Sequence, residues 1–185
     1  MRVFVDKKRE AQEKLQRVLE EERHDIPKLI SSLKKLMQED PYYLESYVYL
    51  AEILENEGHI KEAEEILIDA LNKAMELIKD EDGNLPDRLE WKYETNRHII
   101  KAILEAGIMF WEVGDVDRAL EVLKMLYKLD PEDPVGVRYY ILAILEGMGF
   151  EEFELTFGKN GGYDTESLEK WFENHKEKLE EFIED

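Results

Sequence analysis

The chain lacks cysteine, long apolar runs and an apolar N-terminal segment. Without cysteine it can form no disulfide, no thiolate metal site and no cysteine nucleophile, which is compatible with a reducing compartment. The longest apolar run, residues 139–145, is too short to span a bilayer. Residues 1–6 do not resemble a secretory signal. We therefore expect a cytoplasmic protein.

The chain is also poor in bases, with 25 Lys and Arg against 45 Asp and Glu and a formal net charge of −20. Such a charge repels phosphate backbones and anionic membrane surfaces. We therefore expect neither nucleic acid nor membrane as a partner. A basic protein partner, in contrast, would be attracted.

Leu, Ile, Ala, Glu and Lys dominate the composition, and five prolines interrupt it, which favours helices. Apolar residues recur at helical spacing and no segment alternates as a strand does, so the predicted fold class is all-α. The expected helices cover roughly residues 6–23, 27–39, 41–57, 60–80, 86–113, 116–129, 133–147 and 165–183. Loops are expected at residues 80–84, and residues 154–163 are expected to form a flexible connection.

A spacing pattern around Gly58 occurs again around Gly114. Apolar or small residues stand eight and seven positions before each glycine and five, nine and twelve positions after it. They are Leu50, Ala51, Ala63, Leu67 and Ala70 in the first copy, and Ala106, Gly107, Ala119, Leu123 and Leu126 in the second. Small residues at these positions let two antiparallel helices approach closely, with the glycine in the turn.

These two copies resemble tetratricopeptide repeats, which are helix–turn–helix units that stack into solenoids. The resemblance rests on residues 44–71 and 100–131, with Pro41 and Pro131 as closing prolines. It implies a superhelix of stacked antiparallel hairpins with capping helices at both ends. The last helix, residues 165–183, is expected to cap the stack rather than to bind a partner.

The copies depart from that family in their separation, because adjacent units would place the two glycines about 34 residues apart. The extra residues predict an extended hairpin of helices over residues 60–113. We expect one domain over residues 1–185, with N-terminal helices in residues 6–40. Two units would occupy residues 41–131, and a partial unit and capping helix residues 132–185.

The resemblance implies a protein-interaction module that is not an enzyme and needs no cofactor or metal. In that family the first helix of each unit lines a concave groove that receives a peptide or a helix of a partner. By register the groove would include Tyr49, Glu52, Leu104, Ile108, Trp111, Arg138 and Tyr139. The alternative is a homodimeric assembly protein, formed through the long hairpin and the terminal helices, with no groove ligand.

Other candidate sites have a simpler explanation. An aromatic cluster beside two arginines could grip a peptide carboxylate or stack on a planar group, or the aromatics could pack the long hairpin while the arginines pair with acids. Its residues are Trp91, Tyr93, Asn96, Arg97, Arg138 and Tyr139. The four histidines are scattered and predict no metal site. Residues 158–162 place a lysine among glycines but lack the spacing of a phosphate loop, so a turn is expected.

Overall fold

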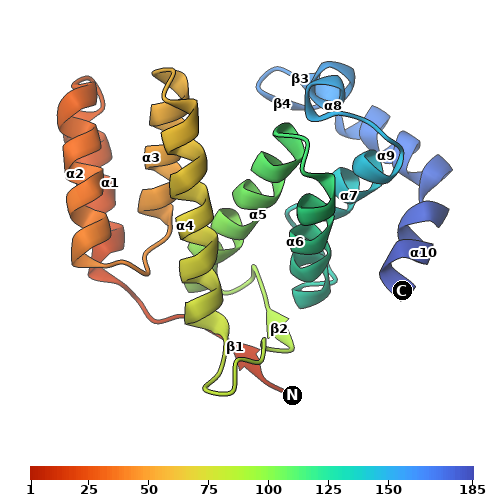
Figure 1. The fold of residues 1–185 in the computed structure, drawn as a ribbon, viewed down its shortest axis with the longest axis horizontal. Helices are drawn as coiled ribbons and strands as arrows, with labels where there is room; N and C mark the ends of the chain where they lie inside the picture. The colour runs from red at the N-terminus through yellow and green to blue at the C-terminus, as the bar shows by residue number, and fades with distance from the viewer. The chain divides into compact units, whose positions relative to one another are not determined.

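The computed structural model describes residues 1–185 and divides them into two compact units, Met1–Ala106 (unit 1) and Gly107–Asp185 (unit 2). It contains ten α-helices and four strands of two residues each, which confirms the all-α class (Figure 1). No helix is long and apolar enough to cross a membrane. The single domain over residues 1–185 stays a prediction.

Unit 1 begins with two antiparallel helical hairpins that lie side by side (Figure 1). Helices α1 (Glu10–Glu22) and α2 (Ile26–Glu39) form the first, and α3 (Glu45–Asn56) and α4 (Ile60–Ile78) form the second. Each helix buries one apolar stripe, as its spacing predicts. The fully buried side chains include Leu33, Leu44, Leu50, Ala70, Ala74 and Ile78.

Local signals explain where these helices start and turn. The Asp25 carboxylate accepts a hydrogen bond from the Lys28 N–H at 3.2 Å, and a proline follows in the first turn of α2. Gly58 has a φ of 83° between α3 and α4, a left-handed conformation that costs glycine nothing. The predicted turn at Gly58 is therefore confirmed.

The predicted helix over residues 86–113 is wrong in its first part, because α5 runs only over Arg97–Glu112. Residues 79–96 instead contain a loop, the strand β2 (Arg88–Leu89) and the short 3₁₀ helix η1 (Glu94–Asn96). The expected extended hairpin of residues 60–113 is therefore absent.

The N-terminal segment is the physical reason for this difference. Strand β1 (Val3–Phe4) pairs with β2 in parallel, and the backbone oxygen of Arg2 accepts from the N–H groups of residues 87 and 88. The Arg2 guanidinium also donates to the Ile78 oxygen at 2.9 Å, at the end of α4. These backbone bonds hold β2 extended, and residues 6–9 precede α1 rather than begin it.

Unit 2 contains the end of α5 followed by α6 (Val116–Leu129), α7 (Val137–Leu145), α8 (Phe150–Phe157), α9 (Thr165–His175) and α10 (Glu177–Glu184). The expected flexible connection at residues 154–163 is wrong, because it holds the end of α8 and a hairpin of β3 (Gly158–Lys159) with β4 (Gly162–Tyr163). The expected single last helix breaks at Lys176, and both of its halves contact α7.

Gly107 marks a close approach of α5 and α6 inside unit 2. A Cβ atom added there would lie 2.7 Å from Leu123 Cδ2 and 3.0 Å from its Cγ. Leu123 is fully buried, and in a close-packed interior it can shift only by displacing its neighbours. The small residue that the repeated spacing places here is thus required by packing.

We predict that Gly107→Ala lowers the free energy of unfolding by about 1–3 kcal/mol, because the added methyl group overpacks a buried contact. Gly149→Ala is the matched control, since a Cβ there would meet nothing within 4 Å. Urea denaturation of both variants measures the difference. A Gly107→Ala protein as stable as the Gly149→Ala control would contradict the packing argument.

Candidate functional site

A cavity of about 460 Å³ in unit 2 is the best candidate for a binding site. The segment before α7, α7 itself, Phe153 of α8, β4 and the start of α9 form its walls. Among its lining residues are Asp133, Arg138, Tyr139, Tyr140, Tyr163 and Leu168. Two of these, Arg138 and Tyr139, belong to the binding residues predicted from the sequence.

Asp133 organises one wall of this cavity. Its backbone has a φ of 50°, which directs the carboxylate toward the first turn of α7. That carboxylate accepts hydrogen bonds from the N–H groups of Val137 at 2.8 Å and Arg138 at 3.0 Å. Gly136 at the helix cap has no side chain to do this, so Asp133 supplies the cap from three residues upstream.

Asp133 is also the ion-pair partner of Arg138. The Arg138 Nη1 atom lies 2.9 Å from Asp133 Oδ2, and the Asp133 side chain is 3% exposed. Burial raises the pKa of Asp133, while the hydrogen bonds from Arg138 and Val137 act in the opposite direction. A buried carboxylate thus fixes the position of the arginine.

Two aromatic rings also contact the Arg138 guanidinium. Its guanidinium carbon lies 4.2 Å from the centroid of the Tyr139 ring and 5.7 Å from that of Phe172. Arg138 Nη2 donates to the Tyr139 hydroxyl at 2.7 Å, and this hydroxyl donates to the Glu169 carboxylate. Arg138 is therefore held rigidly, with its charge opposed by two acids.

Tyr140, Phe153 and Tyr163 line the cavity as a cluster of rings in mutual contact. The centroid of the Phe153 ring lies 5.5 Å from that of Tyr140 and 5.5 Å from that of Tyr163, and the two tyrosine centroids lie 6.4 Å apart. The rings are tilted or edge to face. The Tyr163 hydroxyl donates to Glu154. Because the three rings fill the space between one another, they do not form an open cage for a cation.

The other predicted binding residues lie elsewhere. Trp111 and Ile108 are buried, at 3% and 8% exposure, and the Trp111 indole donates to the Met148 oxygen at 3.0 Å. In unit 1, Glu52 is exposed, and Tyr49 and Leu104 are half-buried. The role of all seven residues in binding stays a prediction.

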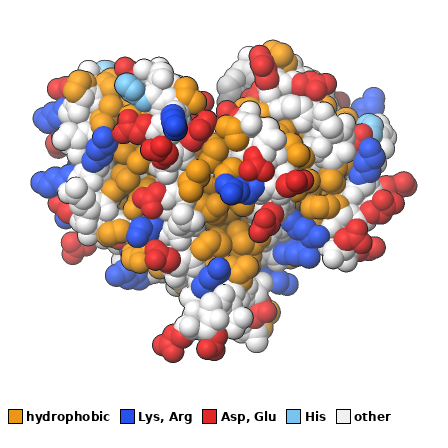
Figure 2. All heavy atoms as spheres, in the orientation of Figure 1, with side chains coloured by type: hydrophobic (Ala, Val, Ile, Leu, Met, Phe, Trp, Pro, Cys, Tyr) orange, Lys and Arg blue, Asp and Glu red, His pale blue; other side chains and the backbone are white.

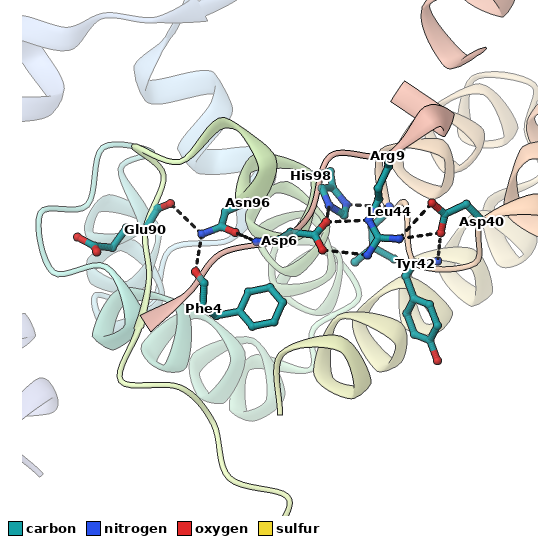
Figure 3. Close-up of polar contacts among 9 residues, drawn as sticks. All are labelled: Phe4, Asp6, Arg9, Asp40, Tyr42, Leu44, Glu90, Asn96 and His98. Atoms are coloured by element: carbon teal, nitrogen blue, oxygen red, sulfur yellow. Dashed lines mark hydrogen bonds and ion pairs between the residues drawn. The ribbon is translucent and has the colours of Figure 1, made fainter. Parts of the chain in front are cut away.

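A buried polar network in unit 1, centred on Asp6, was not predicted from the sequence (Figure 3). The Asp6 carboxylate accepts from Arg9 Nε at 2.7 Å and from Arg9 Nη2 at 2.9 Å. The same guanidinium donates through Nη1 to both oxygens of Asp40, at 2.9 and 3.1 Å. Arg9 thereby joins the N-terminal segment to the end of α2.

His98 completes this network and is fully occupied by it (Figure 3). Its Nδ1 accepts the Leu44 N–H at 3.0 Å, so the proton of the neutral ring is on Nε2, which donates to Asp6 at 2.7 Å. Neither nitrogen is available as a general base. The structure holds no group of three or more His, Asp and Glu side chains suited to a metal ion.

Asn96 links the same segment to the loop before α5 (Figure 3). Its side-chain oxygen accepts the Asp6 N–H at 2.8 Å, and its amide nitrogen donates to the backbone oxygens of Phe4 at 2.8 Å and Glu90 at 3.3 Å. Asn96 is fully buried. The network therefore ties residues 4–9 to residues 90–98.

A comparison with protein families assigns residues 5–147 to the family described as transcriptional repressor TCF25. The chain belongs to this family. The match includes Asp6, its partners Arg9, Asn96 and His98, and the Asp133–Arg138 wall of the unit 2 cavity, but not Phe4, Phe153, Tyr163 or Leu168. Neither the curated proteins nor the solved structures include a match to this chain.

The family assignment overturns the resemblance to tetratricopeptide repeats, which is wrong as a statement of family. The physical reason is that small residues at close helix contacts are required by any tightly packed helical hairpin. The repeated spacing predicted the hairpin of α3 and α4 and the close contact at Gly107, but it carried no information on ancestry. The cytoplasmic location stays a prediction.

The Asp6 network predicts a pH-dependent stability. Burial alone would raise the pKa of Asp6, but the hydrogen bonds from His98 and Arg9 and the charge of Arg9 outweigh it and lower the pKa from 3.8 to about 2. The carboxylate therefore stabilises the fold above about pH 4, and this contribution disappears as the pH falls toward 2. We expect it to amount to about 2 kcal/mol at pH 7.

Urea denaturation of the natural chain and of Asp6→Asn between pH 7 and pH 2.5 measures this contribution. The gap between the two stabilities should shrink as the pH falls below 4. Stability curves that run parallel over the whole range would show that the Asp6 charge does not matter.

Asp133 should be essential to the stability of unit 2 for two separable reasons. Asp133→Ala removes the cap of α7 and leaves Arg138 without its buried partner, and we expect a loss of about 2–4 kcal/mol. Asp133→Asn tolerates the left-handed backbone and keeps a capping oxygen, so we expect a loss of about 1 kcal/mol. Thermal and urea unfolding test this order, and equal losses in both variants would contradict the capping role.

Proposed function

We propose that this chain is a protein-interaction module of a transcription regulator and that the unit 2 cavity receives a segment of a partner protein. The family description supports the link to transcription. The net charge of −20 argues that the chain acts through another protein rather than through direct contact with DNA phosphates. The function proposed is accordingly binding and not catalysis.

The observation that carries the proposal is the rigid Arg138 and Tyr139 pair at the edge of a cavity with aromatic walls. Aromatic and arginine side chains dominate the energetic centres of protein interfaces, above all when they are already held in place. Here Asp133, Phe172 and Glu169 hold them in place before any partner binds.

The partner segment is proposed to be basic and to carry an apolar side chain. Glu132, which lines the cavity, and Glu166, which follows the lining residue Thr165 in the chain, are both exposed. Figure 2 shows, on one face of the molecule, acidic side chains spread among apolar ones. The apolar side chain would enter the cavity while Lys or Arg residues of the segment meet these acids.

Site-specific photo-crosslinking tests the proposal. A photoreactive side chain replaces Thr165, which is exposed and lines the cavity, or Val116, an exposed control on α6. We expect a segment of one partner protein to crosslink from position 165 and not from position 116. A crosslink only to a second copy of this chain would overturn the proposal in favour of the homodimer.

The affinity of the purified chain for the crosslinked partner then measures the charge argument. Glu132→Lys should weaken binding several-fold, and the loss should diminish as salt is added, because exposed charges are screened. Glu121→Lys, an exposed acid on α6, is the matched control. Equal affinities for both variants would reject the basic partner.

A further inference from the structure

Unit 1 contains a second cavity, of about 310 Å³, that is independent of the function proposed above. It lies beside the Asp6 network, between the N-terminal segment, the start of α3 and the start of α5. Its lining is polar and includes Lys7, Tyr43, Thr95, Arg97 and Lys101. Such a concentration of hydrogen-bond donors is unusual in a chain with 45 acids and 25 bases.

Tyr43 is the first sign that this cavity is built for a ligand. Its side chain lies against the His98 ring, with 5.0 Å between centroids, and the residue is only 6% exposed. Its hydroxyl forms no hydrogen bond within the chain, whereas the hydroxyl of Tyr47, which is 2% exposed, donates to the Pro41 oxygen at 2.8 Å. This hydroxyl is not sealed from solvent, and because Tyr43 lines the cavity, its O–H can donate to a group bound there.

Arg97 is the second sign. Its Nε donates to the Trp91 oxygen at 3.1 Å, and its guanidinium lies 5.1 Å from the centroid of the Trp91 ring. These contacts fix the plane of the guanidinium and leave both Nη groups without a hydrogen bond in the chain. A fixed pair of Nη groups matches the two oxygens of a carboxylate.

The charges of the remaining bases decide what the cavity can hold. Arg9 is neutralised by Asp6 and Asp40, and Lys101 pairs with Glu45 at 2.8 Å. Lys7 is exposed and forms no ion pair, so it and Arg97 supply the free positive charge, while Glu94 supplies one opposing negative charge. This balance suits a ligand group with a single negative charge, and a dianionic phosphate would be repelled more strongly by the rest of the chain.

We propose that this cavity is a binding site for a carboxylate, with Arg97 as its planar clamp, the Tyr43 hydroxyl as a further donor and Lys7 at its mouth. The carboxylate belongs to a small molecule or to the C-terminus of a peptide, because both present the same group. The site is formed by unit 1 residues alone and does not depend on the unit 2 cavity.

NMR spectroscopy of the labelled chain, residues 1–185, tests this proposal with sodium acetate as the probe and sodium chloride holding the ionic strength constant. We expect saturable shifts of the Arg97 Nε–H and Tyr43 ring signals in the millimolar range, since so small a ligand supplies little binding energy. Sodium phosphate at the same ionic strength should bind more weakly. No saturable shift, or tighter binding of phosphate, would overturn the proposal.

Two tyrosine variants separate ligand binding from folding. Tyr43→Phe removes a hydroxyl that serves nothing in the fold, so it should leave the melting temperature unchanged and weaken acetate binding about three- to tenfold. Tyr47→Phe should lower the melting temperature and leave acetate binding unchanged. Unchanged acetate affinity in Tyr43→Phe would contradict the role given to this hydroxyl.

Lys7→Gln and the control Arg17→Gln test the charge, since both residues are exposed and outside the core. Only Lys7→Gln should weaken binding, and equal affinities would contradict its role. A short peptide with a free C-terminus, compared with its C-terminal amide, separates the two sources of the carboxylate. Tighter binding of the free peptide than of acetate assigns the site to a peptide terminus, and equal or weaker binding assigns it to a small molecule.

Discussion

The fold of unit 1 depends on one buried carboxylate, that of Asp6. Its oxygens accept hydrogen bonds from Arg9 and His98, and its backbone N–H donates to the Asn96 side chain. Through these residues the N-terminal segment contacts the end of α2, the α2–α3 turn and the loop before α5. Burying a charge is unfavourable unless it is paired and fully hydrogen-bonded, and here every partner is present. The geometry of the network therefore specifies one arrangement of these segments rather than merely stabilising it.

Unit 2 uses the same physical device at Asp133. In both units a buried aspartate pairs with an arginine a few residues along the chain, and in both it also receives backbone or histidine donors that belong to a helix start. In a chain with so many acids, an exposed carboxylate contributes little, because it is solvated and screened. The few acids that matter are those that are removed from water and held by several donors.

The sequence predicted the elements whose causes are local. The Asp25 and proline start of α2, the Gly58 turn and the small residue at Gly107 all follow from spacing and backbone preference, and all are present. The prediction of a helix from residue 86 was wrong because β1, which pairs with residues 88–89 and holds them extended, is far away in the sequence. A proline at a helix start and a proline before a short strand look alike until the partner strand is known.

The residues of the candidate sites likewise differ in whether the sequence alone could identify them. Arg138 and Tyr139 could be singled out because they are conspicuous residue types, and the structure places them together at a cavity. Asp133 and Asp6 could not, because nothing in the sequence distinguishes a buried acid from the many exposed ones. A proline after Asp133 and a helix start four residues later are the only local signal, and they identify a cap rather than an ion pair.

This contrast also indicates where ligands should bind. All three guanidinium nitrogens of Arg9 donate to Asp6 or Asp40, so removing Arg9 would test stability rather than binding. Arg97 is oriented by contacts that leave its two terminal nitrogens without a partner, and the Tyr43 hydroxyl beside the same cavity forms no hydrogen bond within the chain. Hydrogen-bond donors that the fold orients but leaves without a partner are available to bind a ligand, since the entropy of ordering them has already been lost during folding.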